Sequence, residues 1–342
     1  MHLGESDVNG SLYASMCGVD VILRLPMPCA KLGLVAFMLP FKLVYHERYD
    51  LNLGAHVFPS EKFRLIHDKL LSDAIAEPGD FLRPEPASDT DIRRVHTEDW
   101  VHKLKTGTLT ASEQMKLEVP YSPELVQAFW LAAGGTIAAA ESALHDGFGC
   151  NIGGGFHHAY PGHGEGFCAI HDVAVAIRTL QARNKITRAM VVDTDVHHGN
   201  GTAAIFNKDD SVFTLSIHQL NNYPADKPHS SLDLNLEDGV ADEEYLATLL
   251  PAVEKSITDF QPDILFYVGG ADPYREDQLG GLDLSMEGLQ KRDAAVFIEA
   301  RNKNIPVVTT LAGGYARRLQ DTIQIHVNSI LAAKRVAERH NQ

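Results

Sequence analysis

The stretch VVDTDVHHGNGT, residues 191–202, joins an apolar run to a dense group of titratable side chains. The group consists of Asp193, Asp195, His197 and His198. Side chains of an extended segment alternate between two faces, so Asp193, Asp195 and His197 point to the same side. His198 has the opposite parity, which predicts a structural role for it. The stretch therefore predicts a strand that ends in carboxylates and an imidazole directed at one point.

Strand-like and helical patterns alternate from Met38 onward. Mostly apolar runs predict strands at 42–46, around 150, and at 188–195, 212–217, 263–270 and 306–314. Helical patterns lie between them, at 60–73, 122–147, 172–184, 241–259, 285–302 and about 317–339. Continuous apolar runs are typical of strands buried on both faces, and alternation with helices indicates a mainly parallel sheet. No linker or internal repeat follows Met38, so we expect one α/β domain over residues 38–342, with helices on both faces of the sheet.

Residues 1–37 differ from the rest of the chain because they show neither helical nor alternating periodicity. Acidic residues replace the basic start of a secretory signal, and charged residues and prolines interrupt the later apolar run. The segment is neither a good signal peptide nor a membrane helix. We predict that it is an unstructured extension or a mis-assigned start, outside the fold.

Composition restricts the function. Of 342 residues, 44% are hydrophobic and 22% are charged, as in a globular protein with a core and no membrane role. A net charge of −15 argues against direct nucleic-acid binding and is compatible with a cationic substrate. The four cysteines show no CxxC spacing, which favours a reducing, cytoplasmic location. The seventeen histidines are a first indication of metal or proton chemistry.

Four predicted strands end in side chains that can bind metal or transfer protons. Besides the strand that ends in Asp195 and His197, one leads to His157–His158, one to Asp272 and one to Tyr315. Ligands of open parallel sheets bind beyond the carboxyl ends of the strands. We therefore expect these side chains to converge at one edge of the sheet.

Asp195, His197 and Asp272 form a candidate metal site. Three oxygen and nitrogen ligands with an open coordination position are typical of catalytic zinc, and Fe²⁺ or Co²⁺ would suit the same donors. The neighbouring His157 and His158 are candidates for proton transfer. A carboxylate behind the first ring would fix its tautomer and orientation, and Asp193 is the candidate for that position.

Five motifs, in this order and spacing, resemble those of the histone deacetylase and acetylpolyamine amidohydrolase family. They are GGFHHA (154–159), GFCAIHD (166–172), DTDVHHGNGT (193–202), GGADPY (269–274) and LAGGY (311–315). Two further stretches resemble the class IV branch, NNYPAD (221–226) and DQLGGLDLSMEGLQKRD (277–293). The resemblance extends from Met38 to about Ala332. It implies the arginase/deacetylase fold, a three-layer domain around an eight-stranded parallel sheet.

The resemblance also implies roles for individual residues. Asp195, His197 and Asp272 would hold Zn²⁺, and Tyr315 would donate its hydroxyl to the oxyanion that forms during hydrolysis. A structural K⁺ would be held by Asp193, Ser216 and Ile217, with the backbone of Asp195 and His197.

Four further positions concern the tandem histidines and the substrate. Gly166 and Phe167 would line one wall of an acyl-lysine tunnel, with Tyr223 on the opposite side. Behind His158 stands Asn200, where class I enzymes carry Asp and class II and IV sequences carry Asn. Eukaryotic class IV sequences tend to have Gln at the position of His198, so the match to that branch is incomplete.

The expected activity is zinc-dependent hydrolysis of acyl-lysine in peptides or proteins. In it His157 deprotonates the attacking water and His158 protonates the leaving amine. Deacylation of small molecules such as acetylpolyamines, amides or hydroxamates is the alternative, and a non-catalytic acyl-lysine-binding module is a remote one. A binuclear manganese ureohydrolase is disfavoured because Gly199 and Asn200 replace the extra carboxylate that it needs.

Overall fold

The stretch that begins at Val191 lies in β4 (Ala189–Asp193), an interior strand of an eight-stranded sheet. The computed structural model describes residues 39–340. Its strands follow the order β2-β1-β3-β8-β7-β4-β5-β6, and every adjacent pair is parallel. The other strands are β1 (Lys42–Val44), β2 (Phe81–Leu82), β3 (Phe148–Asn151), β5 (Val212–Gln219), β6 (Leu232–Leu236), β7 (Ile264–Gly269) and β8 (Val307–Leu311). The eight-stranded parallel sheet implied by the resemblance is confirmed.

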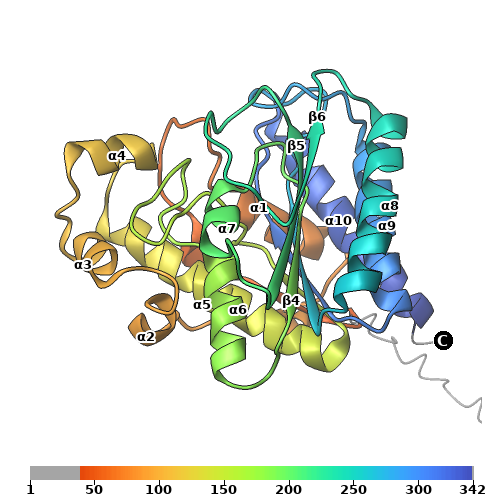
Figure 1. Cartoon of the computed structure of the whole chain (residues 1–342), viewed down its shortest axis with the longest axis horizontal. Helices are drawn as coiled ribbons and strands as arrows, with labels where there is room; N and C mark the ends of the chain where they lie inside the picture. The colour runs from red at the N-terminus through yellow and green to blue at the C-terminus, as the bar shows by residue number, and fades with distance from the viewer. Residues whose placement is uncertain (1–38, 341–342) are drawn as a thin grey trace, which may run out of the picture. The chain divides into compact units, whose positions relative to one another are not determined.

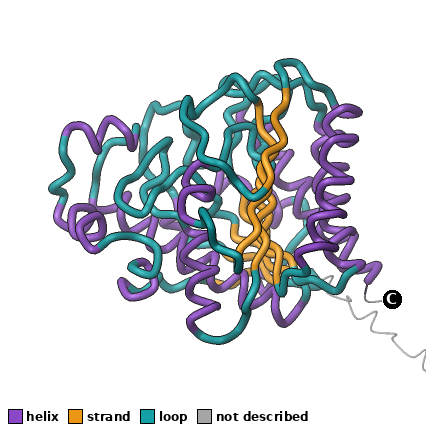
Figure 2. Tube along the Cα trace, in the orientation of Figure 1, coloured by secondary structure: helices purple, strands orange, loops and turns teal. Residues whose placement is uncertain are grey.

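Helices cover both faces of this sheet, which Figures 1 and 2 show edge-on between them. One face carries α5 (Pro123–Asp146) and α6 (Asp172–Ala182), with the short α7 (Asn200–Ile205) beyond β4. The other face carries α8 (Asp242–Phe260), α9 (Met286–Asn302) and α10 (Leu319–His340), and α1 (Lys62–Ser72) packs on α10. Short elements before α5 are α2 (Asp89–Ile92), α3 (Glu98–Thr106), α4 (Ala111–Leu117) and two 3₁₀ turns, Glu47–Tyr49 and Pro78–Asp80. The α/β class with helices on both faces is confirmed.

The middle of the sheet is its most deeply buried part. Every residue of β4, β7 and β8 is buried, as their mostly apolar composition predicts. Burying one Val, Leu or Phe side chain stabilises the fold by about 1.5–3 kcal/mol. These three strands therefore form a rigid base for the loops that follow them.

Strand register brings the segments after β4, β7 and β8 to one edge. Asp193 pairs with Ser216 of β5 and with Val268 of β7. Beyond the strands, the Ala271 amide donates to the Gly313 carbonyl at 2.8 Å. The loops that contain the predicted site residues are thus hydrogen-bonded to one another.

The sheet has two edge strands that the hydrophobic pattern did not predict. β2 has two residues, and β6 has the sequence LDLNL, whose side chains are mostly half-buried or exposed. Residues 1–37, predicted to lie outside the fold, are not among the described residues. Within residues 39–340, no helix is both long and apolar enough to cross a membrane.

Candidate active site

Asp195, His197 and Asp272 meet beyond the ends of β4 and β7. The Nδ1 atom of His197 lies 2.9 Å from Asp195 Oδ1 and 3.4 Å from Asp272 Oδ2. All three side chains are buried, and one potential ligand atom from each lies within 4.8 Å of the others. The structure therefore brings the three predicted metal ligands together.

The environment of this cluster fits a divalent cation. Burial, reinforced by the nearby Asp195 carboxylate, raises the pKa of Asp272 to about 7. Among residues 39–340, no donor makes a hydrogen bond to Asp272 Oδ2, although this atom is buried. A cation would satisfy that oxygen and offset the repulsion between the two carboxylates. One imidazole and two carboxylates suit Zn²⁺, Fe²⁺ or Co²⁺.

Backbone amides hold the carboxylates in place. The Val196 amide donates to Asp272 Oδ1 at 2.9 Å, and the Gly313 amide donates to Asp195 Oδ2 at 2.9 Å. A Cβ atom at Gly313 would lie 2.0 Å from Asp272 Oδ2. Position 313 must therefore be glycine for the backbone to approach both carboxylates.

The tandem histidines lie beside this cluster but have different partners. His157 Nδ1 is 2.7 Å from the Asp193 carboxylate, and His158 Nδ1 is 2.7 Å from the Asn200 amide oxygen. Burial lowers the pKa of His157, but Asp193 and Asp195 outweigh it and raise that pKa to about 9. Burial, together with His157 and His197, drives the pKa of His158 well below its ordinary value. The first ring thus favours the charged form and the second the neutral form.

Glu165 fixes the orientation of Asn200. The Asn200 amide nitrogen donates to Glu165 Oε1 at 2.7 Å, and the Gly201 amide donates to Asn200 Oδ1 at 3.1 Å. Because a carboxylate only accepts hydrogen bonds, these contacts direct the amide oxygen toward His158. His158 Nδ1 therefore carries the proton, and Nε2 keeps its lone pair. Sequence reasoning missed Glu165, although it immediately precedes the GFCAIHD motif.

Two adjoining cavities lead to the cluster. His158, Gly166, Phe167 and Tyr315 line both. A Cβ atom at Gly166 would lie 2.8 Å from the His158 ring, so this wall has no room for a side chain.

Further residues complete the cavity walls. Tyr223, the predicted opposite wall, has its ring centroid 5.1 Å from that of His158. Sequence reasoning missed Phe58, Leu279 and Glu118, which also line these cavities. Phe58 and Glu118 lie outside every motif that the sequence analysis quotes, so no signal pointed to them. Leu279 lies within the stretch 277–293, to which no substrate role was assigned.

Tyr315 reaches the same place from the loop after β8. Its ring centroid lies 6.3 Å from that of His197, and its backbone amide donates to Asp277 Oδ2 at 2.6 Å. Burial, together with Asp195 and Asp272, raises the pKa of Tyr315 well above its ordinary value. The hydroxyl therefore stays protonated near neutral pH and can act as a hydrogen-bond donor.

The remaining predicted residues lie around this centre. Ser216 and Ile217 follow each other in β5, with Ser216 paired to Asp193. Potassium at this position stays a prediction. His198 is separate from the cluster, and its Nε2 faces Asp233 at 3.2 Å.

Comparisons with known proteins identify the family of the chain. The family model described as the histone deacetylase domain matches residues 56–330. The chain is 40% identical to an uncharacterised protein of Picosynechococcus sp. over 84% of this chain and 96% of that protein. It is 35% identical to histone deacetylase 2 of Arabidopsis thaliana, over 82% of this chain and 77% of that one. It is 30% identical to the acetoin utilization protein AcuC of Bacillus subtilis, over 71% and 69% of the two chains.

A solved structure shows the same fold. The crystal structure of the HDA15 HD domain superimposes with a TM-score of 0.71 at 22% sequence identity. The match covers 87% of this chain and 96% of that chain.

Proposed function

Because the chain belongs to the histone deacetylase family and is a hydrolytic deacetylase, we propose that it removes acyl groups from lysine side chains with the help of Zn²⁺. The observation that carries this proposal is the pair of adjoining cavities lined by Phe167, Tyr223 and Tyr315, which reach Asp195 and His197 of the candidate metal site. Its apolar walls suit the methylene chain of an acyl-lysine, and its polar end suits the amide. Membership of the class IV branch stays a prediction.

Asp195, His197 and Asp272 are proposed to hold the metal, which supplies Lewis-acid activation of the acyl carbonyl and of water. Tyr315 donates its hydroxyl to the oxygen that gains negative charge when water attacks the amide. Such a positioned donor contributes about 3 kcal/mol to transition-state stabilisation. Ser216, Ile217 and Asp193 are proposed to hold K⁺, which would support the loop after β4.

The sequence suggested that His157 deprotonates the attacking water. The contacts of the two histidines support His158 in that role instead. His158 has an amide behind it and a free Nε2, so it is suited to take the proton from the attacking water. The proton can then pass from His158 to the departing lysine nitrogen. His157, paired with the Asp193 carboxylate, is suited to remain charged and to stabilise negative charge next to it. We therefore propose His158 as the acid–base group.

Glu165 is a positioning residue in this proposal, because it orients Asn200 and thereby His158. Glu165→Gln replaces a carboxylate that can only accept by an amide that can accept or donate, so it no longer fixes which way the Asn200 amide points. We expect kcat to fall roughly ten-fold with KM little changed. Asn200→Asp should also be impaired, because two carboxylates would then face each other at hydrogen-bond distance. The double variant restores one amide facing one carboxylate and should recover most of kcat.

Steady-state kinetics of the three variants measure this coupling. A merely structural role for Glu165 would give losses that add up in the double variant. Additive losses would therefore remove Glu165 from the proposed arrangement.

One observation favours a second class of substrate. Glu118 lines the outer cavity, and both Glu118 and Glu165 border the groove beside Tyr223. Lys116 borders the same groove, so the two carboxylates outnumber a single ammonium group there. The remaining negative charge would attract a substrate with further positive charge, such as an acetylpolyamine or an acyl-lysine followed by basic residues.

A substrate panel distinguishes these possibilities. Peptides with acetyl-, decanoyl- and myristoyl-lysine, with and without flanking arginines, are assayed beside acetylputrescine. We expect the highest kcat/KM for an acyl-lysine peptide. A preference for acetylputrescine over every peptide would show that the substrate is a polyamine and not a protein. If neither acetylputrescine nor any of the peptides is turned over, the proposed function is contradicted.

A further inference from the structure

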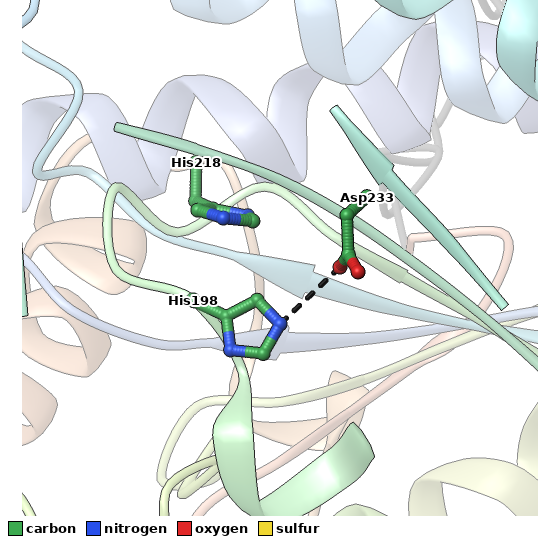
Figure 3. A group of neighbouring side chains, drawn as sticks. All are labelled: His198, His218 and Asp233. Atoms are coloured by element: carbon green, nitrogen blue, oxygen red, sulfur yellow. Dashed lines mark hydrogen bonds and ion pairs between the residues drawn. The ribbon is translucent and has the colours of Figure 1, made fainter. Parts of the chain in front are cut away.

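A second group of two imidazoles and a carboxylate lies outside the proposed active site. His198 follows β4, His218 belongs to β5 and Asp233 belongs to β6 (Figure 3). The His198 Nε2 atom lies 3.2 Å from Asp233 Oδ1, and the two imidazole centroids are 4.6 Å apart. One potential ligand atom from each residue lies within 4.8 Å of the others. None of the three takes part in the proposed hydrolysis.

The hydrogen bonds around this group are incomplete. His218 Nδ1 lies 3.0 Å from Ser216 Oγ, but His218 Nε2 is buried and has no partner among the described residues. His218 and His198 are almost fully buried, with 1% and 0% exposure. A buried polar atom without a hydrogen-bond partner is destabilising, so such an atom calls for an explanation.

We propose that His198, His218 and Asp233 form a second site for a divalent transition metal. Two neutral imidazoles and a carboxylate are a donor set typical of Zn²⁺, Co²⁺ or Ni²⁺. In a tetrahedral zinc site with bonds of 2.0–2.1 Å, the ligand atoms are roughly 3.3 Å apart. The His198–Asp233 pair is already near that separation. A nitrogen of His218 lies within 4.8 Å of both ligand atoms.

The site is accessible from solvent on one side. The Asp233 side chain is 19% exposed, and the fully exposed His229 has its Nδ1 atom 3.8 Å from Asp233 Oδ2. A water molecule or His229 can provide the fourth ligand. A metal held here would link the edge strand β6 to β5 and to the loop after β4.

Metal stoichiometry tests this proposal without relying on activity. The full chain is stripped with a chelator, reloaded with Zn²⁺ alone, and freed of loosely bound ion before zinc per chain is measured. Wild type should retain two ions. Asp233→Asn and His218→Gln should each retain one, and the Co²⁺-loaded variants should lose one set of d–d absorption bands.

Matched variants separate the two sites. Asp272→Asn should also retain one ion, and Asp233→Asn combined with Asp272→Asn should retain none. His145→Gln, which removes an exposed imidazole elsewhere, should retain two. If His218→Gln does not fold, Asp233→Asn decides the result, because it keeps the size of a partly exposed side chain. One ion in wild type, or two in Asp233→Asn, would overturn the second site, whereas loss of activity in Asp272→Asn alone concerns the proposed function.

Discussion

Replacing Tyr315 by Phe is expected to lower kcat by about 10²–10³-fold while metal content and KM stay close to those of wild type. The substitution removes a hydroxyl and keeps the ring, whose centroid lies 6.2 Å from those of Phe58 and Phe167. The buried hydroxyl has a raised pKa, so it is a proton-bearing donor throughout the range of an ordinary assay. Its contribution arises when the carbonyl oxygen becomes negative, so the loss should appear in kcat rather than in binding.

Steady-state kinetics and metal analysis on the same preparation check this result. Tyr121→Phe is the matched control, because it removes a tyrosine hydroxyl that donates to the Leu104 carbonyl away from the site. The control should keep the turnover of wild type. An unchanged kcat in Tyr315→Phe would show that its hydroxyl takes no part in the reaction.

Replacing Asp272 by Asn is expected to have the larger effect, with turnover reduced by at least about 10³-fold and one ion per chain lost. The variant keeps the size of the side chain but removes one of the two charges that face the metal position. Asp272 Oδ2, which accepts no hydrogen bond from any residue between 39 and 340, is available to a cation. With Asp195 as the remaining carboxylate, affinity for a divalent ion should fall sharply.

The control for this variant is Asp283→Asn, which neutralises an aspartate that is 54% exposed and lies outside the cluster. It should keep both metal content and turnover. If Asp272→Asn instead kept its full complement of metal, Asp272 would not be a ligand.

The parts of the fold that the sequence predicted are those with the simplest environment. β4 and β7 pack on both faces, so their apolar runs are uninterrupted and easily recognised. β2 and β6 lie at the edges of the sheet, where one side of each strand has no neighbour and polar residues are tolerated. The short sequence of β2 and the alternating sequence of β6 do not differ enough from loop sequences to be recognised as strands.

The same distinction applies to the candidate site. Strand parity predicted that Asp195 and His197 face one side and His198 the other. In the structure His197 contacts Asp195 and His198 contacts Asp233, although all three follow the end of β4 at Asp193. The contact of Glu165 with Asn200 joins a loop to the first residue of the short helix α7, and neither segment has a periodic pattern from which the contact could be predicted. The partners of His198 could not be found either, because Asp233 lies in the unpredicted strand β6.

The proposed roles of the tandem histidines also needed the structure. Two adjacent imidazoles look equivalent in a sequence, and their order alone does not set their protonation. Their protonation is set by their hydrogen-bond partners, which are a carboxylate behind His157 and an amide behind His158.

Release of acetate from an acetyl-lysine peptide, compared between metal-free and zinc-reloaded protein, tests the central claim most directly. We expect the metal-free protein to release almost none and the reloaded protein to release acetate and free lysine side chains in equal amounts. Asp233→Asn should behave like wild type in this assay, which keeps the second metal site separate from catalysis. Equal acetate release with and without metal, or none from the reloaded protein, would contradict a metal-dependent deacylase of acyl-lysine.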